Sequence, residues 1–389
     1  MNIMIFNEET INPEKGGVKR VSYVLNKAFK KDHEVFCVMP LKIEEMDEDN
    51  YYYFPDNCIY STRNVQFIRD FIKEKDIDII LNQNGISPEA SEFILKYAPQ
   101  NVKIITVPHN SLVSTYGLRQ HIDFRLIPLI PKSIMNFLDH CTNYYFLQKY
   151  KRYWTLVLKR SDSVVLLHKQ LLPSTLSFLR LKSCKKITWI ENPCTIQKTT
   201  NNFSKDNTIL FVGRLASVKN VATIIKAWER IYKDCPNWNV VIVGDGQCRT
   251  ELEKYVLNKK IPRVCFEGTQ NPIEYYEKSK IFCMASYYEG MPLVLLEAME
   301  LGVVPIVINS FETAPAIVHN GENGILLETF SIKAFAEGLL TLIKDDSLLQ
   351  MMSKNCIEQS KNYSIDNIKR EWYELFEKLL NNNIIYKKK

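Results

Sequence analysis

The sequence predicts an α/β protein with two Rossmann-like, parallel-sheet domains that face a central cleft. Short apolar runs such as "MNIMIF" (1–6) and "WNVVIVG" (238–244) alternate along the chain with longer stretches of helical periodicity. Runs that are apolar on both faces and alternate with helices are typical of parallel strands covered on both sides. The length of 389 residues also favours two domains, because a chain of this size exceeds a single hydrophobic core.

The expected elements form two series, one in each half of the chain. The expected strands are 1–6, 33–39, 77–83, 103–109 and 163–169, then 208–213, 238–244, 264–268, 281–286 and 304–309. The expected helices are 17–30, 62–75, 88–97, 219–234, 247–258, 272–279, 293–301 and 332–344. Each half therefore repeats the strand–helix alternation of one parallel-sheet domain.

A polar stretch without apolar periodicity, residues 193–207, separates the two series and is the predicted linker. The N-terminal domain is accordingly placed at 1–192 and the C-terminal domain at 208–365. Residues 366–389 are predicted to form a C-terminal helix and a short basic tail. In open parallel sheets, ligands bind at the carboxyl ends of the strands. Residues that directly follow a strand are therefore the first candidates for a functional site.

The composition is that of a globular protein, with 46% hydrophobic and 24% charged residues. The net charge of +6 is too small to indicate nucleic acid by itself. None of the ten cysteines belongs to a C-x-x-C pair, which favours reduced thiols in the cytosol. The N-terminus lacks the layout of a signal peptide, and no apolar run reaches about 18 residues. These features predict a cytoplasmic protein, at most peripheral at the inner face of the membrane.

The excess positive charge is concentrated in residues 119–160, which hold eight Lys/Arg against two Asp. Aromatic and aliphatic residues are interleaved with these charges. A basic amphipathic segment of this kind favours contact with an anionic membrane surface. An ordinary basic helix face stays open as the alternative, and nucleic acid is disfavoured because no recognised binding module is present.

The stretch "YYEGMPLVLLEAM" (287–299) predicts a helix that starts near Pro292. Proline suits the first turn of a helix, and Gly290 before it relaxes the backbone. The amides of Leu293 and Val294 would then lack partners within the helix. Free amides together with the helix dipole make a binding site for phosphate.

Two carboxylates flank this helix start. Glu297 shares a face with Leu293, one turn further along, and interrupts an otherwise apolar run. A carboxylate there is able to accept hydrogen bonds from neighbouring hydroxyls such as those of a ribose. Glu289, in the loop before the helix, could do the same for a sugar beyond the phosphate. The alternative is a surface-exposed glutamate at each end of an ordinary helix.

Three further loops follow predicted strands. In "ILFVGRLASVKN" (209–220), Arg214 and Lys219 flank a glycine turn and would neutralise a diphosphate. In the first half, Gly16 and Gly17 follow a strand and open a helix, which would let backbone amides approach a ligand. His109 comes straight after the strand "KIITVP" and is the best placed of the six histidines to contact a reacting sugar.

Two motifs that would indicate a cofactor or metal are weak. The "VGDG" of 243–246 gives G-x-G, but Arg249 stands where a dinucleotide motif has Gly or Ala, which favours a structural glycine turn. The "DID" of 76–78 precedes a strand, at the end remote from the expected site. Cys/His clusters are lacking as well, so the sequence predicts no metal and no cofactor.

The motifs of the second half resemble the retaining glycosyltransferases of family 4, a GT-B-fold group within the glycosyl transferases group 1. The resemblance is specific over about residues 207–328 and weaker in the first half. It depends, in order and spacing, on "FVGRLASVKN", "VVIVGDG", "YYEGMPLVLLEAMELGVVPIV" and "NGENGILL".

The resemblance implies a nucleotide-sugar donor held mainly by the C-terminal domain, with the N-terminal domain on the acceptor side. Glu289 and Glu297 match the family's E-x7-E pair, the first toward sugar hydroxyls and the second toward the ribose. Arg214 and Lys219 match its diphosphate-binding pair, and His109 would lie near the donor sugar. Further contacts to donor or acceptor are implied for Gly16, Gly17, Gly290, Met291, Pro292, Leu293 and Val294. The C-terminal helix is expected to cross back onto the first domain.

The expected reaction is retaining transfer of a hexosyl or N-acetylhexosaminyl group without a metal. UDP-sugars are favoured over GDP-sugars as donors, and a lipid-linked glycan of bacterial-type surface polysaccharide synthesis is the expected acceptor. Two other classes stay open. A GT-B epimerase would invert a nucleotide-sugar with no acceptor, and a non-catalytic partner subunit would only bind one.

Overall fold

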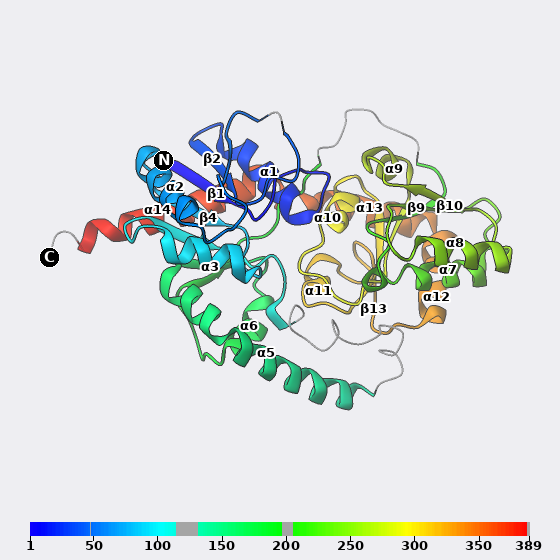
Figure 1. Ribbon diagram of the computed structural model, residues 1–389. Coiled ribbons are helices and arrows are strands. Elements are labelled where there is room, and N and C mark those ends of the chain that lie inside the picture. The colour runs from blue at the N-terminus through cyan, green and yellow to red at the C-terminus, as the bar shows by residue number, and fades with distance from the viewer. Residues whose placement is uncertain (47, 114–130, 197–204, 387–389) are drawn as a thin grey trace. The chain divides into compact units, whose positions relative to one another are not determined.

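The computed structural model describes residues 1–46, 48–113, 131–196 and 205–386. The described residues fall into two compact units (Figure 1). The first unit comprises the described residues within Met1–Gln120, Met135–Thr195 and Ser364–Lys389. The second unit comprises those within His121–Ile134 and Ile196–Tyr363. Each unit is built on one parallel sheet with helices around it, which confirms the predicted fold class of two Rossmann-like sheets.

The first unit has a seven-stranded sheet in the order β3-β2-β1-β4-β5-β6-β7, and every neighbouring pair is parallel. The inner strands β1, β4 and β6 are almost wholly buried on both faces, as their apolar runs predict, whereas the edge strands β3 and β7 are partly exposed. The elements are β1 (Asn2–Phe6), α1 (Gly17–Phe29), β2 (Glu34–Met39), β3 (Tyr51–Tyr53), α2 (Thr62–Glu74), β4 (Ile79–Asn82), α3 (Pro88–Tyr97), β5 (Lys103–Thr106), α5 (Lys132–Arg160), β6 (Ser163–Leu166), α6 (Leu171–Leu179), β7 (Ile187–Trp189) and α14 (Ile365–Tyr386).

The second unit has a six-stranded parallel sheet in the order β10-β9-β8-β11-β12-β13. Its core packs the sheet against α7 and α12 through buried side chains such as Trp228 and Phe335. The elements are β8 (Thr208–Val212), the 3₁₀ turn η3 (Ser217–Lys219), α7 (Val221–Ile231), β9 (Asn239–Val243), α8 (Arg249–Lys259), β10 (Val264–Gly268), α9 (Ile273–Lys278), β11 (Ile281–Met284), α10 (Leu293–Glu300), β12 (Val304–Ile308), α11 (Ala314–Ile317), β13 (Ile325–Leu327), α12 (Ile332–Lys344), α13 (Asp346–Ser360) and the 3₁₀ turn η4 (Lys361–Tyr363).

Each sheet has a point where the strand order reverses. In the first unit this switch lies between β1 and β4, and in the second it lies between β8 and β11. The loops that leave neighbouring strands at such a point turn in opposite directions, which opens a crevice at the carboxyl edge of the sheet. The loops after β1, β4, β8 and β11 are therefore the places to look for a ligand site.

The C-terminal helix α14 lies against α1 of the first unit. The Phe29 and Phe376 rings meet edge to face with centroids 5.6 Å apart, and both side chains are fully buried. At the end of α1, Asp32 accepts hydrogen bonds of 3.0 Å from Lys369 and from the Tyr373 hydroxyl. The two helices are thus joined by an aromatic core with a polar rim.

Within the described part of the chain, no helix combines the length and the apolarity that a membrane span needs. Two predicted segments lie partly outside the described residues. These are the linker, of which 197–204 is not described, and the basic segment 119–160, of which 119–130 is not described.

Candidate active site

An ion pair joins two of the predicted site residues in the second unit. The Lys219 ammonium lies 2.5 Å from Glu289 Oε1, and the side chains are only 22% and 13% exposed. Lys219 ends the 3₁₀ turn after β8, and Glu289 lies in the loop after β11. The two loops are also tied through the backbone, because the Tyr287 N–H donates to the Val218 carbonyl at 2.8 Å. The pair therefore lies at the switch point of the second sheet.

Arg214 belongs to the same group of charges. It follows β8 and its side chain is exposed. Burial raises the pKa of the neighbouring Tyr288, the charge of Glu289 raises it further, and the charge of Arg214 opposes the shift. Arg214 and Glu289 thus both act on the Tyr288 phenol, and Glu289 is in turn paired with Lys219.

Glu297 is fully buried on α10, the helix that follows the loop of Glu289. The hydroxyl of Tyr276, from α9, donates to Glu297 Oε2 at 3.1 Å and also approaches the Val294 carbonyl at 3.3 Å. Tyr276 is itself fully buried, so the carboxylate is held by a partner that solvent does not reach. The alternative of two surface-exposed glutamates is wrong for both Glu289 and Glu297. Tyr276 is a residue that sequence reasoning missed.

The loop between the two glutamates presents the N-terminus of α10. The helix begins at Leu293, and Pro292 is its N-cap residue, in agreement with the predicted start near Pro292. Thr313 fixes the loop by donating to the Gly290 carbonyl at 2.7 Å. The first amides of a helix have no acceptor within it and carry the positive end of its dipole. Those of Leu293 and Val294 therefore lie where an anionic group would be stabilised.

The "VGDG" turn has a structural role here. A Cβ atom at Gly244 would lie 2.0 Å from the Gly213 carbonyl oxygen, so only glycine permits this approach of the two loops. The Leu215 N–H in turn donates to the Asp245 carbonyl at 2.8 Å. The turn therefore supports the loop that carries Arg214, as expected for a structural glycine turn.

The remaining predicted residues belong to the first unit. Gly16 has φ of +126° at the start of α1, with open space where a Cβ would stand, and Gly17 is the first residue of the helix. His109 follows β5 and is half-buried. Its Nε2 is hydrogen-bonded to Oε1 of Gln83, the residue directly after β4. Burial lowers the pKa of His109 to about 4, so the imidazole is neutral at pH 7.

His168, after β6, is held by contacts of both its ring nitrogens within the first unit. Its Nδ1 accepts the backbone N–H of Gln170 at 3.1 Å, which leaves the proton on Nε2. That nitrogen lies 3.1 Å from Glu191 Oε1. Burial raises the pKa of Glu191 to about 7, with a smaller contribution from Glu371, and burial lowers the pKa of His168. Both groups of the pair are thus held toward their neutral forms.

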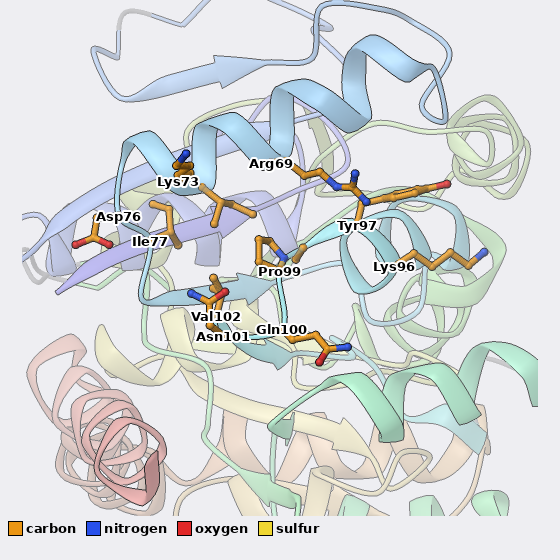
Figure 2. A pocket seen from close by; sticks show the side chains of 12 residues that line it. Arg69, Lys73, Asp76, Ile77, Lys96, Tyr97, Pro99, Gln100, Asn101 and Val102 are labelled. Atoms are coloured by element: carbon orange, nitrogen blue, oxygen red, sulfur yellow. The ribbon is translucent and has the colours of Figure 1, made fainter. Parts of the chain in front are cut away.

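A cavity of about 510 Å³ in the first unit lies away from these residues (Figure 2). Its walls include Asp76, just before β4, and Val102, just before β5, so it opens at the amino ends of the strands. The charged side chains around it point in different directions rather than toward one centre (Figure 2). Lys96 is paired with Glu92 at 2.8 Å. The cavity is therefore not part of the candidate site.

Among the residues that the structure describes, no three His, Cys, Asp or Glu side chains gather as potential metal ligands. Independence from a metal stays a prediction.

Comparisons with known proteins agree with the motifs. Residues 195–359 match the profile of the glycosyl transferases group 1. Over 202 residues the chain is 32% identical to GalNAc-alpha-(1->4)-GalNAc-alpha-(1->3)-diNAcBac-PP-undecaprenol alpha-1,4-N-acetyl-D-galactosaminyltransferase of Campylobacter jejuni, covering 51% of this chain and 56% of that protein. Over 159 residues it is 34% identical to UDP-Gal:alpha-D-GlcNAc-diphosphoundecaprenol alpha-1,3-galactosyltransferase of Escherichia coli, covering 39% and 41%. The chain thus spans about half the length of the curated relatives it matches.

Among solved structures, the pneumococcal O-GlcNAc transferase GtfA, in complex with UDP and GlcNAc, is similar with a TM-score of 0.74 and 13% identity. The match covers 98% of this chain and 99% of that one, so the similarity of fold extends through both units. The architecture is thus GT-B, and the segment 195–359, with every predicted site residue of the second unit, matches the glycosyl transferases group 1.

Proposed function

We propose that the protein is a retaining glycosyltransferase of family 4 that transfers a sugar from a UDP-sugar to a lipid-linked glycan in bacterial-type surface polysaccharide synthesis. The observation that supports this proposal most strongly is the group at the switch point of the second sheet. Arg214 and Lys219 follow β8 there, and Glu289, the N-terminus of α10 and the fully buried Glu297 follow β11. Cations suit a diphosphate, and buried carboxylates suit the hydroxyls on either side of it.

In the proposed mechanism, the leaving diphosphate develops negative charge at its outer phosphate. Arg214, Lys219 and the first amides of α10 would stabilise that charge where it forms. Glu289 would hold hydroxyls of the donor sugar, and Glu297 those of the ribose. The sugar gains oxocarbenium character, and no further carboxylate is assigned as a nucleophile, so the acceptor attacks the same face and the leaving phosphate takes its proton. The proposed reaction needs no metal.

The donor and acceptor classes follow from the relatives and from the charge distribution. The two curated relatives are named for undecaprenol-linked substrates, and the second is named for a UDP-sugar donor. The proposal extends both features to this chain, with a hexosyl or N-acetylhexosaminyl group transferred. Nucleic acid is not a proposed partner.

A membrane surface is the proposed site of action, reached through the basic segment 119–160. In the described part of this segment, the first half of α5 exposes apolar side chains at helical spacing: Ile134, Phe137, Leu138, Tyr144 and Tyr145. Phe137 is 67% and Tyr145 61% exposed. The cations Lys149, Lys151 and Arg152 follow along the helix. A basic helix with apolar side chains suits an anionic lipid interface.

Co-sedimentation with phosphatidylglycerol vesicles tests this surface. The wild type should bind, and a Phe137→Ser/Tyr145→Ser variant should lose at least half of the bound fraction while its melting temperature stays unchanged. Equal binding of both proteins would contradict the assignment of α5 as the contact.

The activity test offers UDP-sugars together with undecaprenyl-diphosphate-linked saccharides and measures both UDP release and the lengthened lipid product. We expect both in EDTA, and we expect an Arg214→Ala variant to lose at least tenfold in rate. Conversion of the sugar without an acceptor would identify an epimerase instead. Binding of UDP-sugar without either reaction would identify a non-catalytic subunit.

A further inference from the structure

A glutamine next to His109 forms a pair with it at the carboxyl edge of the first sheet. Gln83 directly follows β4 and His109 follows β5, and these strands are parallel neighbours. Gln83 is only 2% exposed, and its Oε1 is hydrogen-bonded to Nε2 of His109. The described residues make no hydrogen bond to the other ring nitrogen, Nδ1. Within the described residues, Nε2 of His109 is therefore held by Gln83, and Nδ1 is available to a ligand.

The chemistry of the amide decides which ring nitrogen carries the proton. A neutral imidazole has one N–H, and a carbonyl oxygen only accepts, so contact with Oε1 places the proton on Nε2. The opposite orientation of the amide would instead place the proton on Nδ1.

The surroundings of Gln83 favour the first orientation. Its amide nitrogen has no partner among the described residues. It borders a small cavity that is also lined by Glu191, Asn192 and Trp372, in which a water molecule's centre has about 10 Å³ of room. That is close to the minimum for one water. Glu191 is the other ionisable side chain among the described residues that line this cavity. Its carboxyl accepts from an amide N–H₂ in either protonation state, whereas it donates to an amide oxygen only when it is protonated.

We propose that Gln83 is a positioning residue that holds His109 in the Nε2–H tautomer and so presents Nδ1 to the substrate as a hydrogen-bond acceptor. The identity of that substrate group, a hydroxyl of the donor sugar, rests on the proposed function. A neutral acceptor suits such a hydroxyl, whereas an imidazolium would oppose the positive charge that develops on the sugar during transfer.

The tautomer is measured by two-dimensional ¹⁵N–¹H NMR of the imidazole rings in protein labelled at histidine. In the wild type we expect His109 to have its proton on Nε2 and to stay neutral down to about pH 5. His168 is the internal reference, because the backbone N–H of Gln170 fixes its tautomer independently. A proton on Nδ1 of His109 in the wild type would overturn the proposal without any variant.

Two variants separate positioning from packing. Gln83→Met has a similar shape but no acceptor, and it should remove the tautomer preference and lower kcat about tenfold or more with little change in KM for the donor. Gln83→Glu keeps the acceptor and adds a negative charge, so the Nε2–H tautomer should persist. It should also raise the pKa of His109, and activity should recover as pH rises above the new value.

An unchanged tautomer and unchanged kcat in Gln83→Met would refute the role. If the NMR signals of both variants are as expected but the wild type turns over no nucleotide-sugar, the positioning role of Gln83 holds. Only the assignment of a donor-sugar hydroxyl to Nδ1 is then wrong. The NMR measurement thus distinguishes failure of this inference from failure of the proposed function.

Discussion

Replacing Glu289 by glutamine should weaken the fold of the second unit and strengthen its binding of UDP. The carboxylate lies 2.5 Å from Lys219, and both side chains are mostly buried. Removing one partner of a buried pair costs about 3–5 kcal/mol, and the remaining exposure of these side chains reduces this to about 2 kcal/mol. For a domain of this size, the melting temperature should fall by about 4–8 °C.

The gain in UDP binding also results from the loss of the Lys219–Glu289 ion pair. A diphosphate that approaches Lys219 competes with the Glu289 carboxylate and is repelled by it. A charge-assisted hydrogen bond is worth about 1.5–3 kcal/mol, so releasing Lys219 should improve binding by at least the lower value, or about tenfold in Kd. Sugar transfer should nevertheless slow at least tenfold, because the group proposed to hold the donor sugar is lost.

Isothermal titration with UDP and thermal unfolding measure the two effects. The matched control is Glu337→Gln, which breaks an exposed Lys333–Glu337 pair on α12 and should change neither quantity. Unchanged or weaker UDP binding by the Glu289→Gln variant would refute the view that Lys219 is shared between the carboxylate and the diphosphate.

Three other substitutions test separate parts of the structure. Tyr276→Phe removes the hydroxyl that donates to the buried Glu297, so urea unfolding should show a loss of about 1.5–3 kcal/mol, and titration should show weaker UDP-sugar binding. No change in either would contradict a supporting role. Glu191→Gln should be more stable than the wild type above neutral pH. Burial raises the pKa of Glu191 from 4.5 to about 7, so the wild type is most favoured below pH 4.5 and loses about 3 kcal/mol as the pH rises through 7. A stability difference that is the same at pH 5 and pH 8 would be inconsistent with this. Phe376→Ala should destabilise the first unit by about 3–5 kcal/mol, because its ring is fully buried between α14 and α1. A loss below about 1 kcal/mol would show that α14 contributes little.

The strands and the loops of the second unit could be predicted because their signals are local. Each buried strand is a short apolar run bounded by turn residues, and the parallel order follows from the alternation with helices. Glu297 could be predicted as a site residue because it is a single carboxylate within an apolar helix. In the structure, Glu297 is buried together with the apolar residues around it.

Tyr276 could not be predicted in the same way. It lies 21 residues before Glu297, on a short helix whose sequence "IEYYEK" does not distinguish it from Tyr275. Only the tertiary fold brings its hydroxyl to the carboxylate on α10. Gln83 is an intermediate case: it ends a predicted strand, where the rule for strand ends applies, but its contact with His109 depends on the pairing of β4 with β5.

The central claim is that the second unit binds a nucleotide-sugar through Glu297 and the charges around it. The most direct test is the melting temperature of the wild type and of Glu297→Ala with UDP-, GDP- and ADP-sugars in EDTA. A ligand at 100 times its Kd adds about 2.7 kcal/mol, a shift of about 5–10 °C. The account predicts such a shift with a UDP-sugar in the wild type and its loss in the variant. No shift with any nucleotide-sugar, or an equal shift in both proteins, would contradict it.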